Sequence, residues 1–258
     1  MTQDDLSEEQ GQDTFISHLI ELRSRLLKAV VSILIVFVVL FLYPGPSAIY
    51  DTLAQPMLNS LPDGTRMIAT GVITPFMVPV KVTLMAAFIM ALPIVLYQVW
   101  AFVAPGLYKH EQRLALPLII SSTLLFIAGM AFCYFFMFRT VFHFIATFAP
   151  QSITPAPDIE AYLSFVMTMF MAFGLTFEVP VAVVLLVKTG MISLEKLRAA
   201  RGYVIVSAFI IAAVVTPPDV VSQFMLAVPL CLLYEVGLLC ARLITPKPPT
   251  TDALCEQP

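Results

Sequence analysis

Long apolar runs that carry almost no charged residues alternate with short polar stretches along most of the chain. A run of about 20 apolar residues is long enough to cross the hydrocarbon core of a bilayer as a helix. The pattern predicts six membrane-spanning helices, near residues 26–43, 82–100, 114–138, 162–187, 203–215 and 220–241. The fold class that follows is an all-α integral membrane protein.

The last two apolar runs are separated only by the sequence Thr216-Pro217-Pro218-Asp219. Two consecutive prolines end a helix, because each lacks a backbone N–H and clashes with the preceding turn. The two runs therefore predict a hairpin of two short final helices. The run 203–215 would rise about 20 Å, less than the roughly 30 Å of the hydrocarbon core, so we expect the bilayer to thin beside it.

The composition fits a membrane protein and leaves room for little else. Of the 258 residues, 59% are hydrophobic and 12% are charged, whereas soluble domains carry about 25% charged residues. Because spans take up most of the chain, no stretch is left for a separate soluble catalytic domain of roughly 100 residues. Any function must lie in the loops, at the helix ends or within the bundle.

Positive charge is distributed unevenly between the two sides that six spans define. Both termini lie on one side, and eleven of the 14 Lys and Arg residues fall on that side. The opposite side has Arg66 and Arg139, with Lys81 near it. Because cytoplasmic loops are enriched in Lys and Arg, we expect both termini in the cytoplasm. The net charge of −3 argues against nucleic-acid partners.

The two longer outer connections, 44–75 and 139–161, are rich in proline. They also contain apolar residues such as Leu53, Met57 and Phe148. We expect them to form ordered caps on the bundle.

The cysteines and histidines show no metal-binding or redox spacing. Cys133, Cys231 and Cys240 fall in apolar stretches, and the sequence contains no CxxC pair and no HExxH. The three histidines lie on separate segments. We therefore expect no metal site, no cofactor and no catalytic residues.

The start of the first span carries the first candidate site. As a helix, residues 15–32 place Glu21 on a polar face with Arg25 and Lys28, whereas Arg23 falls on the apolar face. The spacing of Glu21 and Arg25 predicts an i,i+4 ion pair, an ordinary surface feature that the spacing alone favours. The position of Arg23 is equally well explained if the aliphatic part of its side chain lies along lipid and its guanidinium group lies among the lipid phosphates.

The connection between the second and third spans, residues 100–111, combines aromatic residues with one carboxylate, Glu111. An interfacial aromatic belt and a first-turn Glu would explain it without a further function. Glu21 and Glu111 on the same inner rim would also suit a cationic peptide, because guanidinium groups prefer planar carboxylates that they can bind through two hydrogen bonds.

Three polar residues inside or beside the later spans are further candidates. Glu178 lies well within the fourth span, where insertion costs about 2.5 to 3.5 kcal/mol, so a functional group is the default interpretation. The alternative is a protonated Glu that is hydrogen-bonded to a neighbouring helix. Capping and interhelical hydrogen bonds would account for Thr216 and Gln223, at the outer end of the final hairpin.

Several sequence motifs resemble those of the TatC family, whose members belong to the twin-arginine protein translocase. They are residues 18–23 (HLIELR), 97–102 (YQVWAF), 105–111 (PGLYKHE), 177–180 (FEVP) and 216–219 (TPPD). The resemblance runs from about residue 15 to about residue 242 in the family's order. It covers a six-span translocase domain at 15–242 and implies a protein of the cytoplasmic (inner) membrane. A polar acidic cytoplasmic tail at 1–14 and a cytoplasmic tail at 243–258 are expected outside it.

What the resemblance implies for function is a concave, glove-shaped membrane receptor for the twin-arginine signal peptides of folded precursor proteins. The implied partners are the single-span A and B translocase subunits, membrane lipid and further copies of the chain. Transport in this family draws on the proton-motive force and needs no nucleotide. The chain accordingly lacks a GxxxxGK[ST] phosphate-binding loop.

The resemblance also assigns roles to individual positions. The signal-binding surface would consist of Glu21, Arg23, Phe102, Lys109 and Glu111, in which Glu21 and Glu111 contact the arginines of the signal. The remaining positions are Glu178 in the concave face, Thr216 and Gln223 at the contact with the transmembrane helix of a partner subunit, and Pro56 in the outer cap.

Two other classes of protein are alternatives. A small-solute or proton-coupled permease could use an intramembrane Glu as its proton site. It would be expected to show repeated halves, and the chain shows no internal repeat. An intramembrane enzyme would need a metal or nucleophile constellation, which the dispersed His and Cys residues do not supply.

Overall fold

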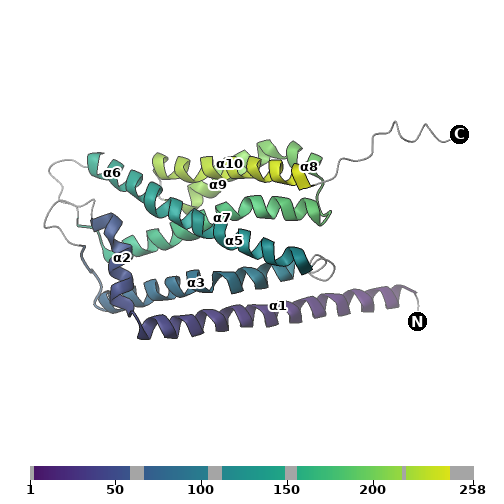
Figure 1. The fold of residues 1–258 in the computed structure, drawn as a ribbon, viewed down its shortest axis with the longest axis horizontal. Coiled ribbons are helices and arrows are strands. Elements are labelled where there is room, and N and C mark those ends of the chain that lie inside the picture. Colours follow the sequence, from purple (N-terminus) through teal and green to yellow (C-terminus); the bar gives the residue numbers. More distant parts are fainter. Residues whose placement is uncertain (1–2, 59–66, 104–111, 149–155, 217–218, 245–258) are drawn as a thin grey trace. The chain divides into compact units, whose positions relative to one another are not determined.

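The computed structural model describes residues 3–58, 67–103, 112–148, 156–216 and 219–244 of the chain (Figure 1). Nearly all of these residues are helical, and their only β-type pairing is an isolated parallel bridge between Ile68 and Asp158. The α-helices are α1 (Gln3–Leu42), α2 (Pro46–Leu58), α3 (Thr74–Val103), α5 (Gln112–Phe132), α6 (Phe138–Phe148), α7 (Ile159–Lys188), α8 (Leu194–Ala199), α9 (Arg201–Val215) and α10 (Val220–Ile244). A single π-helical turn, η1 (Cys133–Met137), joins α5 to α6.

The six predicted spans are confirmed as helical segments. Five are long and apolar enough to cross a membrane, namely Leu19–Leu42, Thr74–Phe102, Leu116–Ile145, Ile159–Lys188 and Val220–Leu243, and the sixth is the shorter Arg201–Val215. Of the final two helices, α9 is short, with 15 residues, whereas α10 has 25. The helices extend beyond the predicted apolar runs because polar residues continue a helix past the hydrocarbon boundary; α1 begins at Gln3, within the stretch expected to be a polar tail.

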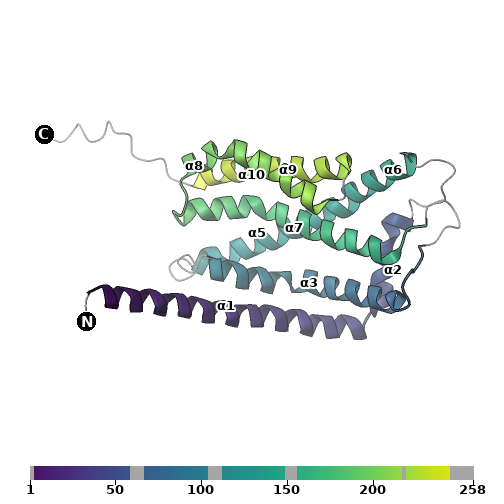
Figure 2. The ribbon, with the colours of Figure 1, turned by 180° about the vertical axis from the view of Figure 1, so that it is seen from behind.

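The chain divides within α7 into two compact units, Met1–Gly174 and Leu175–Pro258. In the first unit, α1 packs along α3, and α3 also contacts α2 and α5 (Figure 2). An aromatic core fills this unit around Phe138, whose ring lies 5.6 Å from Phe142 and 5.4 Å from Phe170. A Cβ at Gly174 would lie only 2.4 Å from the ring of the buried Phe126, so the absence of a side chain there is what lets α5 and α7 approach.

Polar side chains join helices within the first unit. The indole N–H of Trp100 on α3 donates a 2.8 Å hydrogen bond to Ser122 on α5, and both residues are buried. At the opposite end, the hydroxyls of Tyr134 and Tyr162 donate to the backbone carbonyls of α2, Thr52 and Leu53 respectively. The described part of the first outer connection is therefore ordered, and it includes α2, which contains Pro56.

The second unit contains the later part of α7 together with α8, α9 and α10. The hydroxyl of Tyr234 on α10 donates a 2.8 Å hydrogen bond to the carbonyl of Leu197 on α8. The rings of Phe209 on α9 and Phe224 on α10 meet edge to face at 5.3 Å. Gly237 lets α10 approach α7 closely, since a Cβ there would lie 2.9 Å from Cα of Pro180.

We predict that Gly237→Ala destabilises the protein. The added Cβ would collide with the backbone of α7, which cannot move aside as a flexible side chain can, and overpacking of this kind costs about 1–3 kcal/mol. The apparent melting temperature of the protein purified in detergent should fall by several degrees. Gly202→Ala is the matched control, because nothing lies within 4 Å of its Cβ position and Ala is the better helix former. Equal melting temperatures for the two variants would contradict this packing argument.

Candidate functional site

Glu21 and Arg25 form the predicted ion pair at the start of the first span. Arg25 Nε and Nη2 both donate to Glu21 Oε1, at 2.8 and 2.5 Å. The side chains of Arg25 and Glu21 are 25% and 39% exposed, so the pair lies at the edge of the packed structure. Arg23, two residues away from each of them, is exposed.

Phe102 comes to the same membrane surface as Glu21. Glu21 lies in the first turn of the span Leu19–Leu42, and Phe102 is the last residue of the span Thr74–Phe102. Because these two spans are antiparallel neighbours, their residues Glu21 and Phe102 belong to one end of the helix pair (Figures 1 and 2). Phe102 is partly buried. The other two predicted members of this surface, Lys109 and Glu111, lie outside the described residues.

Glu178 is buried, with 7% of its surface exposed. It lies on α7 between the buried Thr176 and the helix proline Pro180. Since Pro180 has no N–H, the helix cannot bond the carbonyl of Thr176 in the usual way. A carboxyl that is buried at this depth avoids direct contact with lipid, as the cost of insertion requires. Its role stays a prediction.

Thr216 and Gln223 both make contacts that stabilise the final hairpin. Thr216 ends α9, and its hydroxyl donates a 2.9 Å hydrogen bond to the carbonyl of Ala212. The amide of Gln223 on α10 donates a 3.3 Å hydrogen bond to the carbonyl of Phe209 on α9. Thr216 is buried, whereas Gln223 is partly accessible. The Gln223 contact agrees with the interhelical bonding expected for this pair, whereas the Thr216 hydroxyl bonds within its own helix.

Glu235, a further acidic residue of the last span, is held by Arg201. Its Oε2 accepts a 2.8 Å hydrogen bond from Nη2 of Arg201, and its Oε1 lies 2.8 Å from Nε of Arg201 in an ion pair. The pair links the start of α9 to α10, and both side chains are about half exposed. Sequence spacing did not reveal this pair, because its members are 34 residues apart.

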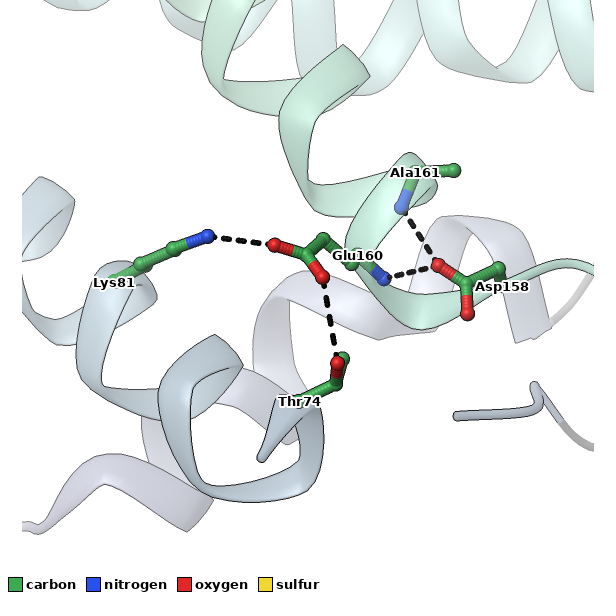
Figure 3. A network of polar contacts seen from close by, with 5 residues as sticks. All are labelled: Thr74, Lys81, Asp158, Glu160 and Ala161. Atoms are coloured by element: carbon green, nitrogen blue, oxygen red, sulfur yellow. Dashed lines mark hydrogen bonds and ion pairs between the residues drawn. The ribbon is translucent and has the colours of Figure 1, made fainter. Parts of the chain in front are cut away.

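A polar network lies at the end of the first unit opposite Glu21 and Phe102, and sequence patterns did not predict it (Figure 3). Lys81 on α3 pairs with Glu160 on α7 at 2.8 Å, and Glu160 also accepts a hydrogen bond from Thr74. Asp158 caps α7 by accepting from the backbone N–H groups of Glu160 and Ala161. An Asp directly before an apolar helix is a recognised N-cap signal, and it would have predicted that α7 begins at Ile159.

Asp158 also fixes the segment that precedes α3. Its Oδ2 accepts hydrogen bonds from the backbone N–H and the hydroxyl of Thr70, at 3.1 and 2.8 Å. Hydrogen bonds from the N–H of Ala161 and from the Thr70 hydroxyl lower the pKa of the Asp158 carboxyl below its usual value. This network is structural, because it connects the start of α7 to α3 and to the segment that precedes α3. Among the described residues no three His, Cys, Asp or Glu side chains are grouped to hold a metal ion.

Comparisons with known sequences point to one family. The family model "Sec-independent protein translocase protein (TatC)" matches residues 17–229. A protein of that name from Halothiobacillus neapolitanus is 51% identical over 238 residues, which are 92% of this chain and 64% of that protein's length. The protein of the same name from Escherichia coli (strain K12) is 49% identical over 232 residues, which cover 90% of this chain and 89% of that one.

Solved structures agree with the sequence comparisons. A crystal structure described as the twin arginine translocase receptor TatC matches with a TM-score of 0.76 and 37% identity, and covers 88% of this chain and 98% of that one. A second crystal structure of such a receptor, in the detergent DDM, gives a TM-score of 0.77 at 36% identity, with 87% and 99% covered. The chain belongs to the TatC family and is therefore a multi-pass membrane component of a twin-arginine protein translocase, and not an enzyme.

Proposed function

We propose that the chain is the receptor component that binds the twin-arginine signal peptides of folded precursor proteins. The observation that carries the proposal is the partly exposed Glu21 carboxylate, held by Arg25 at the membrane surface where the second span also ends at Phe102. The solved structures that resemble this chain are described as twin arginine translocase receptors. In the proposed site, Arg23, Lys109 and Glu111 complete the surface around Glu21 and Phe102.

An ion pair of this kind can exchange its partner. Exposed pairs between residues four apart on a helix contribute only about 0.3–0.5 kcal/mol. A guanidinium group from a signal peptide can therefore displace Arg25 from Glu21, or bind beside it, at little cost. Arg25 keeps the carboxylate oriented until the peptide arrives. Glu111 would supply a second carboxylate, so that each of the two signal arginines meets one acidic partner.

The proposed orientation places this site in the cytoplasm. Lys and Arg residues cluster on the side of the two termini, and such loops face the cytoplasm in bacterial inner-membrane proteins. Precursors that have folded in the cytoplasm would then meet Glu21 and Glu111 before they cross the membrane. The proton-motive force would drive the transport step, without a nucleotide.

The final hairpin would bind a partner subunit. Gln223 uses one amide N–H on Phe209, and its Oε1 accepts no hydrogen bond from any residue that the structure describes. This partly accessible amide would bind a polar group on the transmembrane helix of one of the single-span A and B translocase subunits, beside Thr216. Glu178 would form the polar centre of the concave face, and Pro56 in α2 would belong to the outer cap.

The decisive experiment measures the affinity of the purified full-length protein for a twin-arginine signal peptide. Glu21→Ala and Glu111→Ala should each weaken binding roughly 10- to 150-fold, because a hydrogen bond to a charged group contributes about 1.5–3 kcal/mol. The Asp variants keep the charge and should lose less. A Lys-Lys signal should not bind the Ala variants better, since Lys cannot make the two-pronged contact.

Glu195→Ala is the control for the loss of a carboxylate, because Glu195 is exposed on α8 and belongs to a different unit. Its affinity for the signal peptide should equal that of the wild type. If Glu21→Ala and Glu111→Ala also bind as tightly as the wild type, the carboxylates are structural and the proposed site is misplaced.

The proposed topology predicts which cysteines react with a label that cannot cross the membrane. In a chain without its native cysteines, cysteines at positions 63 and 151 should react from the outside, and those at 110 and 196 should react only after the membrane is opened. Position 196 lies in α8, in the short connection between the fourth and fifth spans. External labelling there would rule out the six-span arrangement.

Glu178 should act through hydrogen bonding rather than through charge. Glu178→Gln keeps the size and the hydrogen-bonding groups of a protonated Glu and should preserve transport. Glu178→Leu should reduce co-purification with the single-span subunits about fivefold at an unchanged membrane level, as expected for an interhelical hydrogen bond of about 1 kcal/mol. Glu195→Leu is the surface control. Loss of transport in Glu178→Gln with normal partner binding would point instead to proton exchange at this position.

A further inference from the structure

The outer end of the third span carries an aromatic and basic surface that none of the roles above uses. It extends over η1 and α6 and consists of Phe135, Phe136, Arg139, His143, Phe144 and Phe148, here called the aromatic–basic face. Together with two threonines these residues line an open cavity of about 680 Å³. Phe135 and Phe148 are 73% and 72% exposed, and Arg139 and His143 are exposed as well. An exposed aromatic surface of this size at the end of a membrane span would be buried by contact with an apolar partner.

The basic groups of this face lie at the depth of lipid headgroups. The span begins at Leu116, and a helix rises about 1.5 Å per residue, which places Phe135 roughly 28 Å and Arg139 roughly 35 Å further along. The hydrocarbon core is roughly 30 Å thick. The ring of Phe135 therefore lies at the edge of the acyl chains, and the guanidinium of Arg139 lies among the headgroups, one turn further out.

Arg139 and His143 are available to a ligand. In the part of the chain that the structure describes, no carboxylate pairs with Arg139, whereas Lys81 is paired with Glu160. The hydroxyls of Thr140 and Thr147 in the cavity wall donate to carbonyls of their own helix, of Phe136 and His143. The donors left facing the cavity are thus the guanidinium of Arg139 and the imidazole N–H of His143, which is present in either protonation state.

From this arrangement we infer that the aromatic–basic face binds an anionic phospholipid. The phosphate receives hydrogen bonds from Arg139 and His143, which are four residues apart and hence on one side of α6. The acyl chains lie along Phe135 and Phe136, one turn closer to the membrane centre. The inference needs only the membrane location of the chain and is independent of signal-peptide binding.

A lipid fits this face better than a protein segment does. On this face, Phe135, Phe136 and Arg139 follow one another along the membrane normal in the order in which a phospholipid presents acyl chains and phosphate. Planar guanidinium groups bind phosphate oxygens through two hydrogen bonds. Basic residues near a membrane surface attract anionic lipid over zwitterionic lipid, by about fivefold for each residue.

The test uses photocrosslinking in the full-length protein in nanodiscs of equal parts phosphatidylglycerol and phosphatidylcholine. The crosslinker p-benzoylphenylalanine replaces Phe135, and mass spectrometry of the adducts gives the ratio of the two lipids. The ratio should favour phosphatidylglycerol at least fivefold. Arg139→Gln combined with His143→Gln should return it to the bulk ratio, and Arg139→Lys should give an intermediate value. Both residues are exposed, so the substitutions should leave folding intact, which the melting temperature checks.

Val39 provides the control position, since it is exposed near the end of the first span on the same side of the membrane. A crosslinker there should give the bulk ratio in every variant. The inference is overturned if the crosslinker at position 135 gives the bulk lipid ratio while Arg139 and His143 are unchanged. It is equally overturned if the enrichment of phosphatidylglycerol survives the double substitution. It is also overturned if inorganic phosphate in the buffer abolishes the enrichment, because the site would then take free phosphate and not a lipid.

Discussion

Inside the hydrocarbon core, every backbone N–H and C=O must find its hydrogen-bond partner within the protein, because no water is present. Helices meet this demand residue by residue, and each of the six apolar runs lies within a helix. At the membrane surfaces water is present, and side chains there can accept hydrogen bonds from the first backbone N–H groups of a helix. Asp158 accepts the first N–H groups of α7, and Asp219 accepts the N–H of Ser222 at the start of α10. The polar residues of the chain are thus concentrated where helices begin and end, which is also where a peptide or a partner can reach them.

Close packing between the spans depends on features other than hydrophobicity, since lipid chains are as apolar as leucine. Glycines let helices approach, as Gly174 does beside the ring of Phe126 and Gly237 does beside Pro180. Buried polar groups then add specific contacts, such as the hydrogen bond from Trp100 to Ser122. The first unit adds an aromatic core around Phe138, and its π-helical turn η1, which contributes Phe135 and Phe136 to the aromatic–basic face, interrupts the third span. Helices therefore approach closely where a glycine on one helix faces a larger residue on its neighbour.

Hydropathy was sufficient to predict the six spans and the all-α class, because these follow from contact with lipid alone. The break between the last two helices was predicted from Pro217 and Pro218. Hydropathy could not predict the short helix α8 or the full extent of α1, because their polar residues carry no signal of lipid contact. The pair of Glu21 and Arg25 was predictable from its spacing within one helix. Contacts of Glu235 with Arg201 and of Lys81 with Glu160 join residues 34 and 79 positions apart, and no periodicity within one segment reveals them.

The ion pairs that the structure describes differ in whether they connect two helices or lie within one helix. This difference decides whether a ligand could replace one partner without disturbing the packing of helices. Arg201 and Glu235 connect two helices through a hydrogen bond and a second ion-pair contact, so a ligand that displaced Arg201 would also loosen α9 from α10. Lys81 and Glu160 belong to a network that ties the start of α7 to α3. Glu21 and Arg25 lie on a single helix, whose backbone hydrogen bonds hold it regardless of the pair. A guanidinium group that replaced Arg25 would therefore break a contact within one helix and not a contact between helices, which favours Glu21 as the acidic residue of the proposed site.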